Sequence, residues 1–236
     1  MGQNVNSYCY TENSENTDNL VDSKKPRPGF STIYRTIKRG QTFADLLEAV
    51  ASIDPEVRIR FTSPHPKDFT DDVLHVMTKF PNICKQIHLP AQSGNSEVLE
   101  KMRRGYTREA YLDLVDRVRQ LMPEISISSD FIAGFCGETE EAHKETVDLI
   151  HRVKYNFAFC FPYSMRGKTH AYHKLTDDVP ENVKSRRHME LCDAFRSTAL
   201  ELNRKMIGQK HLVLVEGVFF VLVMSNLHIL LCYLKL

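Results

Sequence analysis

A basic and aromatic stretch offers the first chemistry that the side chains can support. Residues 161–175 contain five lysine, arginine or histidine residues and no acidic one. Arg166, Lys168 and Lys174 carry fixed positive charge, and tyrosines are interleaved with them. Because positive charges neutralise phosphates while aromatic rings stack on bases, the stretch predicts contact with single-stranded nucleic acid. Lys184, Arg186 and Arg187 are expected to extend it, and a solvated surface loop is the alternative interpretation.

Two further segments contain residue types that bind small polar ligands. Ser93 opens a loop, and Arg104 lies in a basic stretch at residues 101–108. A hydroxyl and a guanidinium suit a ligand with hydroxyls and a carboxylate or phosphate, although a surface turn explains the same residues. Gly134 and Gly137 precede Thr139, and they either let the backbone approach a ligand or form a tight turn with Thr139 as N-cap. The pair is not a G-x-G-x-x-G motif, so no dinucleotide site is predicted.

Histidine and cysteine give weaker signals. His65 and His88 lie near predicted strand ends, but no carboxylate partner is specified for either, so both are interpreted as structural. The six cysteines are scattered and form no C-x-x-C motif, and H-E-x-x-H is absent from the sequence. They predict a reduced chain with buried thiols and no local metal site.

A regular alternation of strands and helices must position these loops. Strand patterns occupy residues 56–62, 84–89, 125–133 and 156–163. Helical patterns occupy residues 68–79, 107–121 and 139–153, and an earlier helix begins after Thr42 and ends at Asp54. This order predicts a parallel α/β sheet with right-handed crossovers, in which ligands bind beyond the carboxyl ends of the strands. A long helix over residues 181–207 and a strand over residues 212–215 follow.

The composition and the two ends of the chain restrict the class of protein that this sequence can be. The 236 residues are 42% hydrophobic and 26% charged, as in ordinary globular proteins, and the formal net charge of +1 gives no nucleic-acid signal for the whole chain. Residues 11–30 read as a polar loop, and no secretory signal is predicted. Residues 218–234 are almost continuously apolar but just shorter than the roughly 18 residues of a spanning helix. A buried or misfolded tail is therefore expected rather than stable membrane insertion.

Several segments together resemble one enzyme family, the radical S-adenosylmethionine (SAM) methylthiotransferases that modify tRNA. The resemblance extends from Gly2 to about Gly217 and is greatest to a mitochondrial member. The segments that carry it are residues 2–8 (GQNVNSY), 58–66 (RIRFTSPHP), 88–95 (HLPAQSGN), 102–107 (MRRGYT), 130–139 (DFIAGFCGET) and 161–166 (FPYSMR).

The resemblance implies a partial TIM-like barrel that binds SAM against a 4Fe-4S cluster. It implies a methylthio group added to an isopentenylated adenosine beside the tRNA anticodon, and hence a tRNA anticodon stem-loop as partner. By position in the motifs, it places Gln3 and Asn4 near the methionyl amino group, and Ser93 and Arg104 at the ribose hydroxyls and carboxylate. The adenine-side motif contains Ile132, Gly134 and Glu138, and the RNA-contacting residues remain Arg166, Lys168 and Lys174.

The chain also departs from the family pattern. The cluster-ligating C-x-x-x-C-x-x-C loop is expected upstream of Gly2, so no metal ligand is assigned within the chain. The RNA-binding β-domain is expected to begin near residues 215–217, where the apolar tail stands instead. The predicted divisions are therefore residues 1–40 (strand end and loop), 41–207 (partial barrel, incomplete at its N-terminal strands, with a C-terminal helix), 208–217 (strand) and 218–236 (apolar tail).

These departures predict a fragment that is catalytically inactive alone, with an exposed sheet edge near residues 57–62. The alternative is a non-catalytic module that binds a kinase activator subunit, as the resemblance to the mitochondrial member implies. That member also implies a mitochondrial location, whereas the absence of a targeting peptide from this chain predicts a cytoplasmic one if the chain is made as shown.

Overall fold

The computed structural model describes residues 29–31, 40–62 and 65–210. The predictions for Gln3, Asn4, most of the polar loop at residues 11–30, the strand at residues 212–215 and the apolar tail lie outside these residues. In the part of the chain that is described, no helix is long and apolar enough to cross a membrane.

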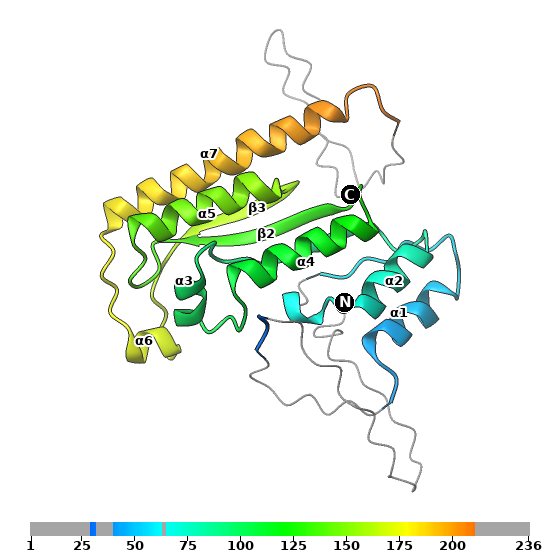
Figure 1. Ribbon diagram of the computed structural model, residues 1–236, viewed down its shortest axis with the longest axis horizontal. Helices are drawn as coiled ribbons and strands as arrows, with labels where there is room; N and C mark the ends of the chain where they lie inside the picture. The colour runs from blue at the N-terminus through cyan, green and yellow to red at the C-terminus, as the bar shows by residue number, and fades with distance from the viewer. Residues whose placement is uncertain (1–28, 32–39, 63–64, 211–236) are drawn as a thin grey trace, which may run out of the picture.

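Three parallel strands form the centre of the fold. The strands β1 (Gln86–His88), β2 (Ser126–Ala133) and β3 (Phe157–Pro162) pair in the order β1-β2-β3 (Figure 1). The helices α3 (Ser96–Lys101) and α4 (Arg108–Leu121) connect β1 to β2, and α5 (Glu140–Val153) connects β2 to β3. The parallel pairing confirms the predicted α/β class, since each crossover holds a helix as expected.

Further helices surround this unit. The helix α1 (Phe43–Ala51), the short 3-10 helix η2 (Pro66–Asp68) and α2 (Asp71–Lys79) precede the sheet. The short helix α6 (His170–Lys174) and the long helix α7 (Glu181–Lys205) follow it. Figure 1 shows α7 running alongside α5, and shows α3 and α6 at the same end of the sheet.

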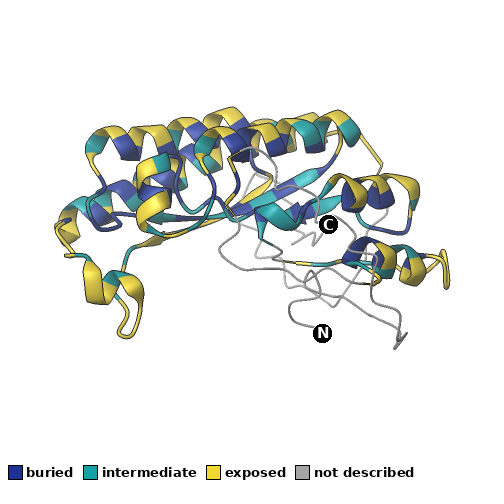
Figure 2. Ribbon diagram, turned by 60° about the horizontal axis from the view of Figure 1, so that its bottom comes forward, coloured by how far each residue is buried: buried dark blue, intermediate teal, exposed yellow. Residues whose placement is uncertain are grey.

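One face of the sheet makes the core, and the opposite face is only partly covered. Alternate residues of β2 are buried, beginning at Ile127 and ending at Ala133, and they join the hydrophobic cluster that contains Leu114 of α4 and Leu149 of α5. The intervening residues of β2 are half-buried (Figure 2). Since both crossover helices cover the same face, the other face is available to line a site.

The predicted strand over residues 56–62 is wrong. Only a single parallel bridge forms, in which the Ile59 amide donates to the Asn82 carbonyl at 2.9 Å and the Ile59 carbonyl accepts the Cys84 amide at 3.0 Å. A turn precedes it, because the Asp54 carboxylate accepts the Glu56 amide at 2.8 Å. The turn uses the donors that a longer ladder would need.

Two short α-helices were not predicted, and each has a local N-cap. The Asn95 side chain accepts the Val98 amide at 3.0 Å at the start of α3, and the Thr169 hydroxyl accepts the Tyr172 amide at 3.2 Å at the start of α6. Both helices are shorter than two turns, so hydrophobic periodicity gives no signal for them. Thr42 caps the helix that was expected to begin after it, and the interpretation of Thr139 as an N-cap is confirmed.

Candidate cofactor-binding site

The uncovered face of the sheet is a candidate binding surface. We call it the open face, and it contains the half-buried side of β2 and the three phenylalanines of β3, Phe157, Phe159 and Phe161, which are 42%, 50% and 51% exposed. The strand register places Asp130 beside Phe159 and Ile132 beside Phe161. Half-exposed aromatic rings in a row are unusual on a sheet that is otherwise well packed, and they offer an apolar surface next to polar groups.

A hydrogen-bonded histidine lies on the same face. The Nε2 atom of His88 is 3.2 Å from Oδ2 of Asp130, and its Nδ1 atom is 3.0 Å from the Ser128 hydroxyl. The register pairs His88 with Ser128, so β1 and β2 bring the three polar side chains together. The expectation that His88 lacks a carboxylate partner is therefore wrong.

A glycine turn follows β2 at the edge where the open face ends. Gly134 has a φ of +76°, and its amide donates to the carboxylate of Glu138 at 2.7 Å. A Cβ at Gly134 would overlap Lys184 Cγ and lie 3.3 Å from the backbone Cα of Lys184 in α7. Glycine is needed at this position because the conformation and the space both exclude a side chain.

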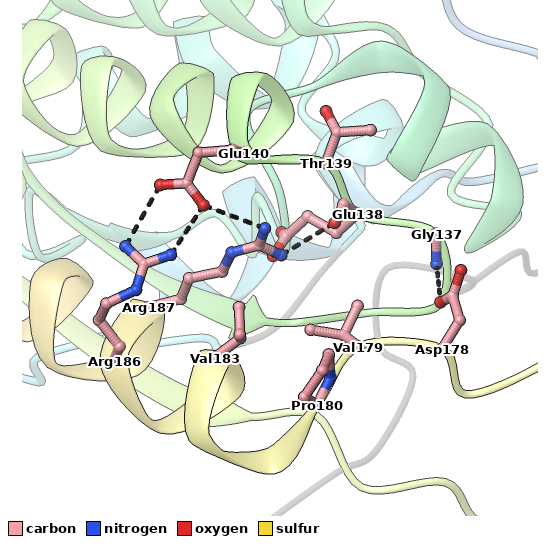
Figure 3. Close-up of a pocket in the computed structure, with 10 residues that line it drawn as sticks. All are labelled: Gly137, Glu138, Thr139, Glu140, Asp178, Val179, Pro180, Val183, Arg186 and Arg187. Atoms are coloured by element: carbon pink, nitrogen blue, oxygen red, sulfur yellow. Dashed lines mark hydrogen bonds and ion pairs between the residues drawn. The ribbon is translucent and has the colours of Figure 1, made fainter.

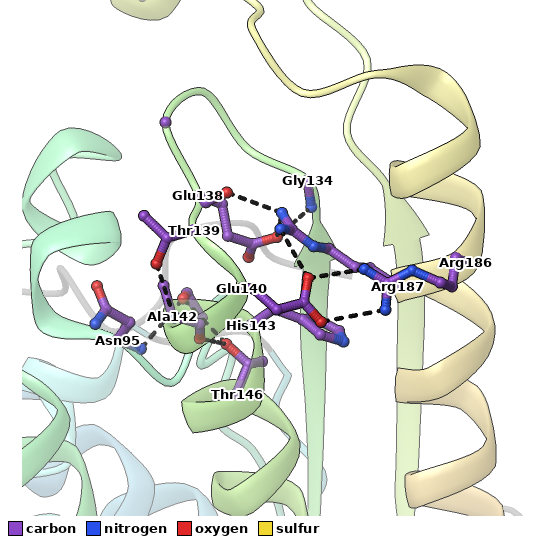
Figure 4. A network of polar contacts seen from close by, with 12 residues as sticks. Asn95, Gly134, Glu138, Thr139, Glu140, Ala142, His143, Thr146, Arg186 and Arg187 are labelled. Carbon is purple, nitrogen blue, oxygen red and sulfur yellow. Dashed lines mark hydrogen bonds and ion pairs between the residues drawn. The ribbon is translucent and has the colours of Figure 1, made fainter.

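The Glu138 carboxylate holds this turn together from inside the protein. Glu138 is 4% exposed, and Arg187 of α7 donates to its carboxylate at 3.1 Å and to its main-chain carbonyl at 2.9 Å (Figure 4). Burial raises the pKa of the Glu138 carboxyl, whereas the Gly134 amide and the Arg187 charge oppose that rise. The second carboxylate oxygen, Oε1, is buried without a hydrogen-bond partner. Glu138 therefore fixes the backbone after β2 and leaves one unused acceptor atom.

A cavity of about 350 Å³ lies behind this turn, between the start of α5 and the start of α7 (Figure 3). Arg186 donates to Glu140 on one side of it at 2.7 Å, and the pKa of the Glu140 carboxyl falls to about 2, chiefly because of the hydrogen bond from Arg186. Arg187 also reaches Glu140 at 3.2 Å. Glu138, Glu140, Arg186 and Arg187 are paired with one another, and Asp178 accepts the Gly137 amide at 2.7 Å. Because its charged side chains already have partners within the protein, this cavity is a weaker ligand-site candidate than the open face.

Ser93 lies beneath α5 and does not line the open face. Its side chain is buried, its hydroxyl is 3.3 Å from the Thr146 hydroxyl, and it accepts the Asn95 amide at 3.2 Å. The next residue, Gly94, donates its amide to Thr146 at 2.9 Å. Because the Ser93 hydroxyl makes its contacts with other residues of the protein, its role in this structure is to hold the loop after β1 against α5.

Arg104 lies beside His65, two residues before a tyrosine that contacts the loop after β1. Its carbonyl is 3.0 Å from His65 Nε2, and the hydroxyl of the neighbouring Tyr106 donates to the Pro90 carbonyl at 2.8 Å. Burial, followed by the Arg104 charge, lowers the pKa of His65. The Nε atom of Arg104 is buried with no hydrogen-bond partner. A buried guanidinium donor without a partner fits a carboxylate-bearing ligand such as SAM.

The predicted RNA-contacting residues lie together around α6. Arg166, Lys168 and Lys174 are exposed, and slight desolvation together with the charge of Arg103 lowers the pKa of His170 in the same helix. Arg103 therefore joins this basic surface from the end of α3. We call the five residues the α6 basic surface.

The extension of that surface into α7 is wrong. The Nζ atom of Lys184 is 2.8 Å from the Asp177 carboxylate and its side chain is buried. Arg187 is buried against Glu138, and Arg186 pairs with Glu140. Each of the three cations is therefore paired with an acidic side chain, 7, 46 and 49 residues away along the chain for Lys184, Arg186 and Arg187.

The described cysteines do not fit a cluster site. Cys84, Cys136, Cys160 and Cys192 lie on different elements, and burial raises the pKa of the Cys160 thiol to about 12. Among the residues that are described, no three cysteine, histidine or acidic side chains gather as they would around a metal ion. Iron–sulfur clusters bind thiolates, so a neutral buried thiol is a poor ligand.

The structure therefore divides the predicted site residues into three groups. Gly134 and Glu138 are joined by a hydrogen bond, and Ile132 lies on the open face two residues before Gly134. Ser93 contacts Thr146 of α5, and Arg104 lies beside His65. Sequence reasoning missed Asp130 and the phenylalanines of β3. Their signal was the two-residue period of Ser128, Asp130 and Ile132 and of the three phenylalanines, which places each set on one face.

Comparison with known proteins places these features in context. The family model of the radical SAM superfamily matches residues 23–150. The chain is 58% identical over 217 residues to the mitochondrial tRNA methylthiotransferase CDK5RAP1 of Homo sapiens, covering 92% of this chain and 36% of that protein. It is 46% identical over 218 residues to the tRNA-2-methylthio-N(6)-dimethylallyladenosine synthase of Amoebophilus asiaticus, covering 92% of this chain and 42% of that protein.

A search of solved structures finds the Escherichia coli coproporphyrinogen III oxidase HemN, a radical SAM enzyme. The TM-score is 0.49 at 19% sequence identity, over 70% of this chain and 37% of that chain. The chain spans about two fifths of the length of the curated relatives it matches.

Proposed function

Because this chain belongs to the radical SAM superfamily, we propose that it contributes the SAM-binding part of a tRNA methylthiotransferase that acts on isopentenylated adenosine beside the anticodon. The observation that carries the proposal is the open face, which ends in the glycine turn at the carboxyl edge of three parallel strands. Ligands of such sheets bind at this edge.

Three groups of the chain are available to SAM at this edge. Ile132 offers an apolar contact for a purine, and the Gly134 turn lets the backbone come close to a ligand. The unused Nε donor of Arg104 suits a carboxylate. When bound, SAM supplies a methyl group and, after one-electron reduction, a deoxyadenosyl radical.

Binding of SAM by the full chain tests this placement. Ile132→Lys should weaken binding by at least about tenfold, because a cation would replace the apolar contact and repel the sulfonium. Ser126→Lys is the matched control, since Ser126 lies on the same face of β2 at its other end, about 20 Å away along the strand. Equal loss in both variants, measured by equilibrium dialysis, would place SAM elsewhere.

We further propose that SAM cleavage requires thiolates other than the four described cysteines. Cys9 and Cys232 are the remaining thiols of the sequence, fewer than the three of a C-x-x-x-C-x-x-C loop, so the proposal is that the chain alone is catalytically inactive. The raised pKa of Cys160 supports this view, and although Cys160 and Cys192 are neighbours, no three of the described cysteines gather at one point. Anaerobic reconstitution with iron and sulfide, followed by a deoxyadenosine assay, tests it. Stoichiometric cluster with deoxyadenosine production would contradict the proposal.

The α6 basic surface is the proposed RNA contact. Each lost phosphate contact should reduce the slope of log affinity against log salt by about 0.7 to 0.9. The double variant Lys168→Ala and Lys174→Ala should therefore lower the slope for an anticodon stem-loop by about 1.5, while Lys79→Ala at the end of α2 should not. An unchanged slope would remove these lysines from the RNA contact, and nuclease-resistant capture of a kinase activator subunit would favour the interaction module instead.

The mitochondrial name of the human relative supports a mitochondrial location for the whole protein. Fractionation of cells that express the endogenous protein tests this, since recovery in the cytosol alone would contradict it.

A further inference from the structure

The open face has a polar half, formed by β2, and an apolar half, formed by the phenylalanines of β3, and together they are complementary to one kind of ligand. Resting on the proposed function, we infer that Asp130, held by His88, and Phe159 form the binding surface for the N6-alkylated adenine base of the substrate nucleoside. Asp130 and Phe159 are register partners on adjacent strands, so a carboxylate lies directly beside a half-exposed ring.

Of the three hydrogen-bonded residues His88, Ser128 and Asp130, it is Asp130 that presents a free acceptor atom to a ligand. Both ring nitrogens of His88 are used, one by Ser128 at 3.0 Å and one by Asp130 at 3.2 Å. The described contacts of the Asp130 carboxylate use Oδ2 alone, and its side chain is 29% exposed, compared with 16% for His88. His88 is thus a positioning residue, and Asp130 presents an acceptor atom to the open face.

An N6-alkylated adenine matches this arrangement. Its N6 atom carries one N–H donor for a carboxylate, its base is planar, and its alkyl group is apolar. The three rings of β3 extend in a row, with Phe159 and Phe161 inclined by only 12° and their centroids 6.3 Å apart. This surface is longer than one purine requires, and an alkyl substituent would cover the remainder.

The carboxylate also gives a reason for selectivity. A substituent that bears its own negative charge would lie near Asp130 in a partly desolvated site, where like charges repel strongly. The surface should therefore accept neutral alkyl groups and reject anionic ones.

This surface is adjacent to the proposed SAM contacts and separate from them. Asp130 precedes Ile132 by two residues, which is about 7 Å along a strand. Variants at Asp130 and at Ile132 should therefore affect different ligands, so failure of this inference can be separated from failure of the SAM proposal.

Equilibrium dialysis of the full chain with three nucleosides tests the inference. The unaltered chain should bind N6-dimethylallyladenosine at least about tenfold more tightly than adenosine, and N6-succinyladenosine more weakly than either. Asp130→Leu should weaken binding of N6-dimethylallyladenosine by about tenfold or more and should reduce the rejection of N6-succinyladenosine. SAM binding should stay within about twofold, because the SAM contacts lie elsewhere on β2.

Matched variants separate the aromatic contact and the positioning role from loss of folding. Phe159→Ser should abolish the preference for the alkylated base, whereas Phe157→Ser, at the end of the row beside Ser128, should retain it. His88→Gln can still donate to Asp130 and should preserve the discrimination against N6-succinyladenosine, which His88→Ala should lose. The inference is overturned if the unaltered chain binds no nucleoside, if Asp130→Leu changes SAM binding more than nucleoside binding, or if it changes neither.

Discussion

Gly134→Ala should destabilise the fold, because this residue joins the end of β2 to α7. Its φ of +76° costs an L-residue about 1–2 kcal/mol. The added Cβ would overlap Lys184 Cγ and lie 3.1 Å from Lys184 Cβ. Lys184 cannot swing away freely, since its Nζ atom binds Asp177 and Glu181, each at 2.8 Å. Displacing such a contact costs about 1–3 kcal/mol, so the total loss should be about 2–5 kcal/mol.

Urea denaturation followed by circular dichroism measures this loss. Gly167→Ala is the matched control, because a Cβ there would meet nothing within 4 Å, and it should change the free energy of unfolding by less than about 0.5 kcal/mol. Gly134→Ala should also weaken SAM binding, since the turn borders the open face. Equal stability of the two variants would refute the argument that close packing at α7 fixes this turn.

Two other predictions concern the contacts between α5 and α7. Burial lowers the pKa of His143, so folding favours its neutral form, and the free energy of unfolding should decrease as the pH falls through 6.5. His143→Gln should flatten that decrease in urea titrations from pH 7.5 to 5.5, whereas the exposed His151→Gln on the same helix should not; equal slopes in both variants would contradict the assignment. Arg187→Met should cost about 3–5 kcal/mol, because it leaves the buried Glu138 carboxylate without a cation. The exposed Arg196→Met in α7 should cost less than about 0.5 kcal/mol in the same assay, and a similar loss in both would show that the buried pair contributes little.

Local patterns predicted most of the elements correctly. The helices α4 and α5 have amphipathic periods and threonine N-caps, α7 has an amphipathic period without a side-chain N-cap, and β2 and β3 have strand patterns bounded by turns. These signals depend on neighbours within a few residues, so they can be recognised in the sequence without knowledge of the fold. The strand expected over residues 56–62 failed because a strand also needs a partner for its backbone, and the Asp54 turn diverts part of that segment.

Charge was the property that the sequence represented least well. Lys184, Arg186 and Arg187 look like a basic surface in the sequence, yet acidic side chains neutralise each of them. For Arg187, that partner is 49 residues away along the chain. Electrostatic partners are set by spatial distance, which a linear pattern does not contain.

The sequence alone determined the class of fold, the parallel order of its strands and the family motifs at the strand ends, because repeated local signals encode each of them. The tertiary structure alone decided which residues face a ligand. It turned Ser93 and Glu138 inward to hold the loops, and it aligned His88, Asp130 and Phe159 across three strands on the open face. Strand register and helix packing fix those positions, and both depend on contacts between residues that are distant in the chain.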